Sequence, residues 1–285
     1  MMSLIVKIRR FIYALRHLKP IYRYGGVATF KIETPSYNSI LKGKCILVTG
    51  GSSGIGYAIA EKCLGVGAKV IITGRNEEKL KLAQQKLKNP NCYYLRWDIA
   101  EVDSVRQKLK ECYDLSKQPI DILVNNAGVA PIKFFGDVDE EEWQRIYDTN
   151  LKGTYFLIQE IVKEWREFKW DGYRKILNIS SQGGFVGATY PYRMTKWDIR
   201  GLTEGLGKEL IKDNIIVNGI APGIVKTSMQ EFSMRQGDNL YTYQNPVQRV
   251  CLPEEIAELA LFMISDVCNF IIGQTIVCDG GYSLK

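Results

Sequence analysis

Two kinds of segment alternate along the chain from about residue 40 onward. Short apolar runs rich in Val, Ile and Tyr are separated by longer charged stretches of helical character. This alternation predicts a parallel sheet whose strands are joined by crossover helices. The run Ile122-Leu123-Val124 is apolar on both faces, as a strand covered by helices above and below requires. We therefore expect an α/β fold with a single doubly wound, parallel, seven-stranded sheet and helices on both faces. The predicted strands are Cys45–Thr49, Lys69–Thr73, Cys92–Arg96, Ile122–Asn125, Ile176–Ser180, Ile215–Gly219 and Thr275–Cys278.

The first 40 residues follow a different pattern. Residues 4–19 place apolar side chains on one side of a helix and most charges on the other, and Pro20 ends the helix. The predicted organisation is a basic amphipathic extension over residues 1–40 and one domain over residues 41–285. The helix suits peripheral contact with an anionic membrane, packing on the body or a partner subunit, or a mitochondrial targeting peptide. No stretch approaches the roughly 18 apolar residues of a spanning helix, so we expect no transmembrane segment.

Charge and cysteine usage exclude several classes of function. The formal net charge is +7, but residues 1–24 hold six Lys and Arg and no acid, so the remainder is nearly neutral. A nucleic-acid-binding domain would gather Lys and Arg on one face, and we expect none here. The seven cysteines are scattered through apolar runs, which predicts buried thiols in the reducing cytoplasm. Without a CxxC pair, and with His17 as the single histidine, the chain can assemble neither a zinc site nor a Ser-His-Asp triad.

A glycine-rich turn follows the first predicted strand. Thr49–Gly56 has the spacing G-x-x-x-G-x-G and opens a helix predicted from about Tyr57 to Leu64. Glycines let the backbone approach a diphosphate, and the unpaired amides at a helix start attract an anion. Glycine also serves tight turns for purely backbone reasons, but the strand-turn-helix context favours a dinucleotide site in the domain over residues 41–285. The predicted cofactor-binding residues of this turn are Gly50, Ser52, Ser53, Gly54, Ile55 and Gly56.

A tyrosine and a lysine stand one helical turn apart. Tyr192 and Lys196 fall on the same helix face, so the ammonium can lie near the phenol. The positive charge favours the phenolate and lowers the phenol pKa from its usual value of about 10. A tyrosine with a lowered pKa can exchange a proton with a substrate near neutral pH. A chance surface pair is the alternative interpretation. Upstream, the segment after the fifth strand offers a hydroxyl for the substrate oxygen. We select Ser181, eleven residues before Tyr192, over Ser180.

Taken together, these motifs resemble those of the classical short-chain dehydrogenases/reductases, and in particular 3-oxoacyl-[acyl-carrier-protein] reductase-like members. The similarity extends over about residues 40–285 and includes Asn125-Asn126-Ala127-Gly128, Asp148–Gly153, Asn218–Gly223 and Gly273–Gly281. It implies a Rossmann fold and a nicotinamide-dependent oxidoreductase. By the same resemblance, the catalytic residues are Asn150, Ser181, Tyr192 and Lys196. The resemblance adds to the cofactor site Asp98, Ile99, Asn126, Ala127, Gly128, Tyr192, Lys196, Pro222, Gly223 and Thr227.

The end of the second strand bears on the choice of cofactor. NAD-specific proteins usually place an acid there to accept the ribose hydroxyl groups, but this chain has Thr73-Gly74-Arg75. Gly74 leaves space and Arg75 offers a planar fork for a 2′-phosphate, so NADP(H) is favoured over NAD(H). The alternative is that Arg75 only caps a turn.

The substrate class and the oligomeric state are predicted only from the resemblance. It allows small-molecule carbonyls and secondary alcohols, among them 3-oxoacyl thioesters, sugars and polyols, and residues 228–248 correspond to the family's substrate-covering segment. It also implies a homodimer or homotetramer formed through the helix after Asn150 and the helix that carries Tyr192. The residues suited to that face are Tyr155, Phe156, Ile158 and Ile161. A non-catalytic NADP-binding redox sensor and a membrane-associated scaffold with the same fold are the competing functions.

Overall fold

The computed structural model describes residues 37–167, 170–227, 240, 242 and 244–284. The amphipathic helix predicted over residues 4–19 lies outside the described residues, as does the predicted extension up to residue 36. Residues 37–285 form one compact unit by their contacts. No helix of the described ranges is both long and apolar enough to cross a membrane.

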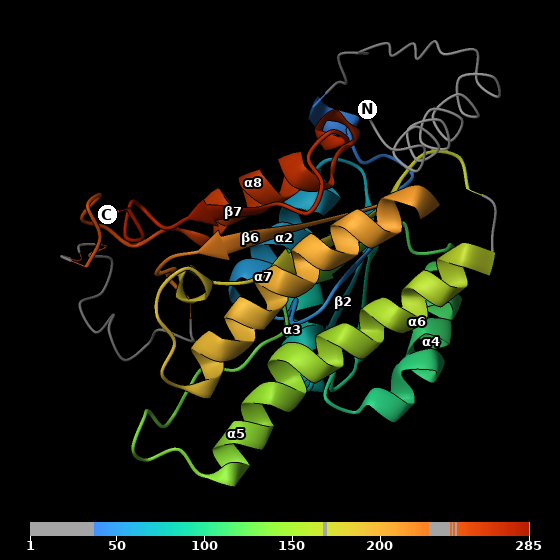
Figure 1. The fold of residues 1–285 in the computed structure, drawn as a ribbon. Coiled ribbons are helices and arrows are strands. Elements are labelled where there is room, and N and C mark those ends of the chain that lie inside the picture. Colours follow the sequence, from blue (N-terminus) through green and yellow to red (C-terminus); the bar gives the residue numbers. More distant parts are fainter. Residues whose placement is uncertain (1–36, 168–169, 228–239, 241, 243, 285) are drawn as a thin grey trace, which may run out of the picture. The chain divides into compact units, whose positions relative to one another are not determined.

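A seven-stranded parallel sheet forms the centre of this unit, as predicted (Figure 1). The strand order is β3-β2-β1-β4-β5-β6-β7, and every neighbouring pair is parallel. Strands β2 and β3 therefore lie on one side of β1, and β4 to β7 follow in order on its other side. This is the topology of a Rossmann fold. The strands are β1 Cys45–Val48, β2 Lys69–Gly74, β3 Cys92–Arg96, β4 Ile122–Asn125, β5 Arg174–Ile179, β6 Ile215–Pro222 and β7 Thr275–Cys278.

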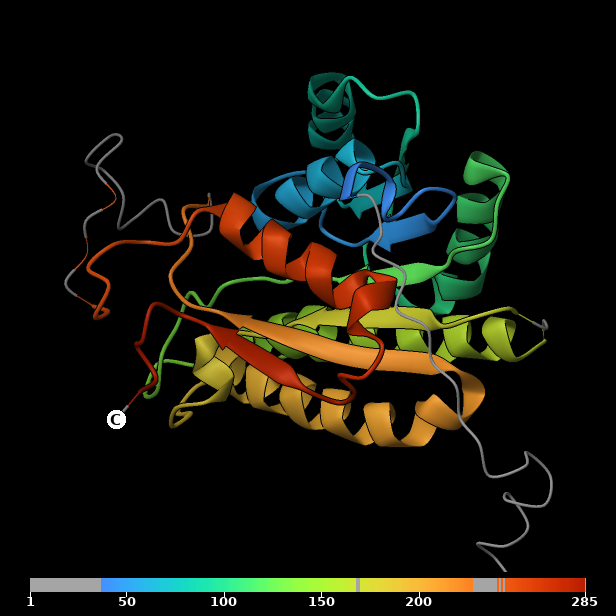
Figure 2. The same cartoon turned by 90° about the horizontal axis from the view of Figure 1, so that it is seen from above.

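Helices cover both faces of the sheet (Figures 1 and 2). One face carries α2, α3 and α8, and the other carries α4, α6 and α7, with α5 joined to α6 by the π-helical turn Asp148–Lys152. The bounds are α2 Gly54–Gly65, α3 Glu77–Leu87, α4 Val105–Ser116, α5 Glu140–Tyr147, α6 Gly153–Glu167, α7 Pro191–Leu210 and α8 Pro253–Ile264.

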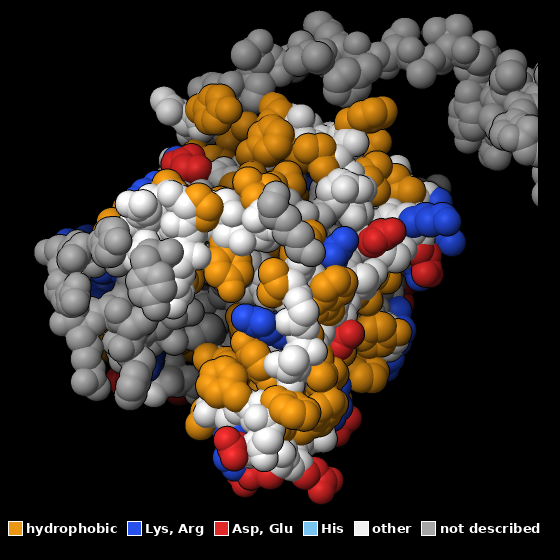
Figure 3. Space-filling view, turned by 60° about the vertical axis from the view of Figure 1, so that its left-hand side comes forward, with side chains coloured by type: hydrophobic (Ala, Val, Ile, Leu, Met, Phe, Trp, Pro, Cys, Tyr) orange, Lys and Arg blue, Asp and Glu red, His pale blue; other side chains and the backbone are white. Residues whose placement is uncertain are grey.

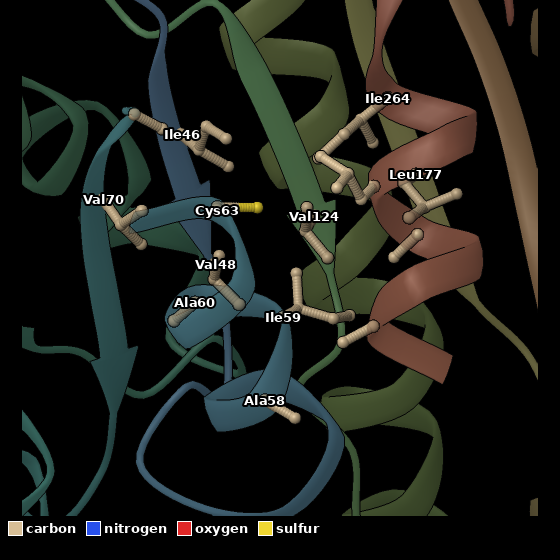
Figure 4. Packing of buried hydrophobic residues seen from close by; sticks show 14 of the residues in the cluster. Ile46, Val48, Ala58, Ile59, Ala60, Cys63, Val70, Val124, Leu177 and Ile264 are labelled. Atoms are coloured by element: carbon tan, nitrogen blue, oxygen red, sulfur yellow. The ribbon is translucent and has the colours of Figure 1, made fainter. Parts of the chain in front are cut away.

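Each face of the sheet has its own hydrophobic core. Successive residues of β1 alternate between the two cores: Ile46 and Val48 pack under α2 and α8, whereas Cys45 and Leu47 pack under α4 and α6. Figure 4 shows the first core, where Ile59 and Cys63 of α2 and Ile264 of α8 converge on β1 and β4. A strand buried on both faces needs an unbroken apolar run, which explains why the sequence pattern located the strands so well.

The helix face predicted for subunit assembly is partly buried within the monomer. Ile158 and Ile161 of α6 point into the second core and are buried, because α6 must cover its own sheet. Tyr155, on the outer side of the same helix, is 44% exposed. Two of the four residues named for an assembly face therefore stabilise the monomer and are not available to a partner.

The carboxyl ends of the parallel strands all meet at one edge of the sheet. At this edge the chain leaves β1 for α2 and leaves β4 for the other half of the fold, so the loops after the two strands separate. A crevice at such a switch point is where open α/β sheets bind their ligands.

Candidate active site

A cleft of about 340 Å³ lies at this carboxyl edge. Its walls come from the turn after β1 and from the segments that follow β2 to β6, and Tyr192 and Lys196 of α7 also line it. Of the predicted cofactor-binding residues, those in the lining are Gly50, Ser52, Ser53, Gly54, Ile55, Arg75, Asp98, Ile99, Asn126, Ala127, Gly128, Tyr192, Lys196, Pro222, Gly223 and Thr227. Gly56 and Asn150 are outside it. Motifs spread over more than 170 positions of sequence thus share one cavity.

The glycine-rich turn is shaped by two left-handed backbone positions. Gly50 has a φ of +66° and Gly54 a φ of +57°, and a Cβ at Gly50 would lie 2.9 Å from the Ala127 Cα. Helix α2 begins at Gly54, three residues before the predicted start, so its first amides face the cleft. Ser53, the N-cap residue, makes no capping bond with its side chain, which leaves its hydroxyl for a ligand.

Gly56 has a packing function in this turn. A Cβ there would lie 2.6 Å from the Gly50 carbonyl oxygen and 2.4 Å from the Asn126 Nδ2. Glycine therefore permits the close approach of α2 to the turn, and the residue stays out of the cleft lining.

The Asn126 segment is tied to the end of β1. The Thr49 Oγ1 accepts hydrogen bonds from the backbone amides of Asn126 and Ala127, each at 3.0 Å, and the Asn126 Nδ2 donates to the Thr49 carbonyl at 2.9 Å. These bonds hold the carboxyl ends of β1 and β4 at a fixed separation. Asp98 closes its own turn by accepting from the Ala100 amide at 3.1 Å, and with Ile99 it lines the cleft.

Basic side chains stand where the second strand ends. Arg75 is exposed at the cleft edge, together with Asn76 and Lys79. The adjacent acids do not neutralise them, because Glu77 and Glu78 both pair with Lys81, at 3.5 and 3.2 Å. A Cβ on Gly74 would already be in van der Waals contact with the Ser52 hydroxyl, 3.6 Å away, so glycine keeps this basic corner free of a side chain.

Ser181, Tyr192 and Lys196 come together at the other end of the cleft. Ser181 and Tyr192 both line the cleft, and the Ser181 hydroxyl is close enough to the Tyr192 phenol to lower its pKa. The Lys196 Nζ lies 5.6 Å from the centroid of the Tyr192 ring and donates to the Ile179 carbonyl at 3.0 Å. Burial lowers the pKa of Lys196 to about 8, since the charged ammonium loses hydration.

The tyrosine differs from the expectation in one respect. Burial raises the pKa of Tyr192 above its ordinary value, and this effect outweighs the lowering by the Ser181 hydrogen bond. The phenol is consequently protonated near neutral pH. The sequence shows the cation one helical turn away but not the burial of the phenol, which raises the pKa.

The two neighbouring serines have different surroundings. Ser180 is buried, and its Oγ donates to the Lys196 carbonyl at 2.8 Å, which fixes the strand to α7. Ser181 keeps its hydroxyl on the Tyr192 side, where it also accepts from the Gly183 amide at 3.1 Å. Of the two, Ser181 has the geometry to contact a substrate oxygen.

Asn150 lies beside the cleft without lining it. The residue is in the π-helical turn, where its Oδ1 accepts from the Val129 amide at 2.8 Å and its Nδ2 donates to the Val129 carbonyl at 3.1 Å. This pair of bonds ties the turn between α5 and α6 to the segment after β4. π-Helical turns inside helices often occur at functional sites.

The segment after β6 forms the remaining wall. Gly223 allows close contact with the following turn, since a Cβ there would lie 2.7 Å from the Asp279 Cα. Thr227 reaches the glycine-rich turn, where its Cγ2 would be 3.0 Å from a Cβ on Gly54. The predicted substrate-covering segment at residues 228–248 lies mostly outside the described residues.

Several lining residues were not predicted from the sequence. Lys79 stands four residues after Arg75, and that spacing could have identified it. The remaining side chains have no distinguishing pattern in the sequence: Thr73, Asn76, Trp97, Thr149, Ile179 and Val225.

Comparison with known families agrees with the geometry of this cleft. The sequence model of the short chain dehydrogenase family matches residues 44–237. The chain belongs to this family. It is therefore an oxidoreductase acting on alcohol or keto groups, in a family that binds nicotinamide cofactors.

Characterised relatives cover nearly the whole described unit. A 3-oxoacyl-[acyl-carrier-protein] reductase of Aquifex aeolicus is 35% identical over 85% of this chain and 98% of its own length. A 3alpha-hydroxysteroid dehydrogenase of Mediterraneibacter gnavus is 34% identical over 85% of this chain and 97% of its own. Among solved structures, the Pseudomonas aeruginosa RhlG/NADP active-site complex is similar with a TM-score of 0.80 and 30% identity, over 88% of this chain and 100% of that one.

Proposed function

We propose that this protein is an NADP(H)-dependent reductase that transfers a hydride between the nicotinamide and a carbonyl or secondary alcohol. One observation carries the proposal: Ser181, Tyr192 and Lys196, whose Nζ is 5.6 Å from the Tyr192 ring centroid, line the same cleft as the glycine-rich turn. A proton donor and a dinucleotide site in one cavity are what a carbonyl reduction requires.

The residues present fit a dinucleotide. At Gly50 a side chain would fill the space beside Ala127, the start of α2 offers unpaired amides, and the Ser53 hydroxyl has no capping bond. These groups suit a diphosphate at the positive end of the helix dipole. Asp98 and Ile99 would flank the adenosine, and Pro222, Gly223 and Thr227 the nicotinamide end. When bound, the reduced nicotinamide supplies the hydride.

Tyr192 acts as the acid in the direction of reduction. Its phenol, protonated at neutral pH, donates a proton to the carbonyl oxygen as the carbonyl carbon gains its new C–H bond. The product is the alcohol, and the phenolate left behind is stabilised by the ammonium of Lys196. Ser181 donates a hydrogen bond to the same oxygen while negative charge develops on it. Asn150 positions the turn beside the cleft, and in the oxidative direction each proton step reverses.

The basic corner at Arg75 supports NADP(H) as the cofactor. A 2′-phosphate would meet the Arg75 guanidinium and the Lys79 ammonium, neither of which is occupied by a carboxylate in the described part of the chain. A planar guanidinium forms charge-assisted hydrogen bonds with phosphate oxygens. NAD(H) would leave both cations without a partner.

The substrate belongs to the carbonyl compounds and secondary alcohols, and a 3-oxoacyl thioester is the first candidate. The similarity to 3-oxoacyl-[acyl-carrier-protein] reductases favours it, and the hydroxysteroid dehydrogenase shows that a relative of equal similarity acts on a different alcohol. Assembly as a homodimer or homotetramer is part of the proposal. The outer face of α5, α6 and α7 exposes Trp143, Tyr155 and Trp197 in support of it.

Absorbance assays of NADPH and NADH oxidation across a carbonyl panel test the proposal. The panel includes 3-oxoacyl esters and thioesters, cyclic ketones and keto sugars. Reduction of at least one class, with a higher kcat/KM for NADPH than for NADH, is expected. Tight NADPH binding without turnover of any member would instead favour the redox-sensor function.

A further inference from the structure

Two of the seven cysteines differ from the rest in their exposure. All seven lie in the described ranges as free thiols, and five are buried, whereas Cys251 and Cys278 are half-buried. Both of these lie at the carboxyl edge of the sheet. Figure 3, in which this edge comes forward, shows hydrophobic side chains, a class that includes cysteine, gathered over this side of the molecule. The proposed carbonyl reduction uses neither thiol.

The backbone anchors these two cysteines to neighbouring peptide units of one segment. Cys278 is the last residue of β7, and its carbonyl accepts a hydrogen bond from the Gly223 amide at 3.0 Å. The Cys251 amide donates to the Ile224 carbonyl at 2.8 Å. Gly223 and Ile224 are consecutive, so two residues that are far apart in the sequence are fixed next to each other at the end of β6.

The two side chains are close enough to change each other's ionisation. The Cys251 S–H stabilises the thiolate form of Cys278 and lowers the pKa of Cys278, whereas the same interaction raises the pKa of Cys251. Burial raises the pKa of every other cysteine of the chain, which keeps those thiols protonated. These are Cys45, Cys63, Cys92, Cys112 and Cys268. Of the seven, Cys278 is therefore the nucleophile, and a second thiol lies beside it.

We propose that Cys251 and Cys278 form a site of reversible oxidation, at which a peroxide converts the two thiols into an intramolecular disulfide. The Cys278 thiolate attacks one peroxide oxygen and becomes a sulfenic acid, and the other oxygen leaves as hydroxide and takes up a proton. The Cys251 thiol then displaces the sulfenic oxygen as a second water, and the S–S bond forms. The two thiols lose two electrons, which reduce the peroxide, and a dithiol reductant reverses the change.

The disulfide would act on the wall of the cleft. Gly223 lines the cleft and is packed tightly against the residue after β7, since a Cβ on it would lie 2.7 Å from the Asp279 Cα. A disulfide holds its sulfurs about 2 Å apart, closer than two separate thiols can approach. The segments bonded to Gly223 and Ile224 must therefore shift, and the wall shifts with them. The expected weakening of NADPH binding rests on the proposed cofactor site, whereas the disulfide itself does not.

Peptide mass spectrometry of the full chain after hydrogen peroxide treatment and alkylation tests the site. We expect a disulfide that joins the Cys251 and Cys278 peptides, with a mass lower by two hydrogen atoms, and that dithiothreitol removes. Cys251→Ser and Cys278→Ser each abolish this product. Cys268→Ser, at a buried cysteine shortly before β7, is the matched control and retains it. By fluorescence titration, the oxidised wild type binds NADPH several-fold more weakly than the reduced protein, and peroxide-treated Cys278→Ser does not.

The outcomes separate the thiol site from the proposed function. The site is overturned if both cysteines of the treated wild type remain open to alkylation, if Cys278 stops at a sulfinic acid, or if it joins a second chain on a nonreducing gel. A Cys251–Cys278 disulfide that leaves NADPH affinity unchanged supports the site and overturns its effect on the cleft wall. If the reduced wild type does not bind NADPH, the proposed cofactor fails, and the disulfide still decides the thiol site.

Discussion

The Nζ of Lys196 lies 5.6 Å from the centroid of the Tyr192 ring, and its hydrogen bond goes to the Ile179 carbonyl and not to the phenol. The ammonium is thus anchored to the end of β5, and the residue is largely buried beside the ring. In this position it can stabilise a phenolate by charge without competing with the substrate for the phenol. The protonation state of Lys196 then determines whether a Tyr192 phenolate is stabilised.

The pH dependence of reduction follows from this arrangement. Burial lowers the pKa of Lys196 to about 8, whereas the pKa of Tyr192 is raised, so the first group to lose its proton on going alkaline is Lys196. We predict that kcat/KM for carbonyl reduction falls as pH rises through about 8, because the phenolate that forms loses its cation. The pH profile of kcat/KM reports the pKa values of the free enzyme, and the inflection near pH 8 is assigned to Lys196. Lys196→Met should lower the rate at pH 7 and remove the inflection; an inflection that survives in this variant would assign it elsewhere.

Cofactor preference depends on Arg75. We predict that Arg75→Glu lowers kcat/KM for NADPH by about tenfold to a hundredfold, the worth of a charge-assisted phosphate contact, and changes that for NADH far less. Initial rates measured over a range of each cofactor, at a fixed carbonyl concentration, give the ratio of kcat/KM for NADPH to kcat/KM for NADH. Lys86→Glu makes the same charge change on α3 outside the cleft lining and should leave the ratio unchanged. Equal losses for both cofactors in Arg75→Glu would contradict the assignment.

Two glycines of α7 give opposite predictions for stability. A Cβ at Gly207 would lie 2.5 Å from the Gly273 Cα, so Gly207→Ala should reduce the free energy of unfolding by about 1–3 kcal/mol. Two residues earlier, a Cβ at Gly205 meets nothing within 4 Å, and Gly205→Ala should raise stability by about 0.5–1 kcal/mol. Urea denaturation of both variants checks the contrast. Similar effects in the two would mean that the helix does not approach Gly273 this closely.

The sequence predicted the sheet well because burial on both faces demands continuous apolar runs. The bounds of β3, β4 and β7 match the prediction. Strand β6 runs on to Pro222, three residues beyond its predicted end, because its pairing with β7 continues through Pro222 and Cys278. Such pairing depends on a partner more than fifty residues away, and no local pattern reports it.

The candidate site shows the same division between local and long-range information. Motif spacing identified Tyr192 and Lys196, but the direction of the Tyr192 pKa depends on burial that only the folded chain creates. Likewise, the sequence favours Ser181 over Ser180 only by its distance from Tyr192, whereas in the folded chain the Ser180 hydroxyl is distinguished by its bond to the Lys196 carbonyl.

The central claim is that the Tyr192 phenol supplies the proton for carbonyl reduction. The most direct test compares NADPH oxidation by the wild type and by Tyr192→Phe at saturating carbonyl substrate, with NADPH affinity measured separately by fluorescence. The variant lacks only the hydroxyl, so cofactor binding should be kept while kcat falls by about a hundredfold or more, as expected for loss of a general acid. An unchanged kcat in Tyr192→Phe, with NADPH bound normally, would contradict the account.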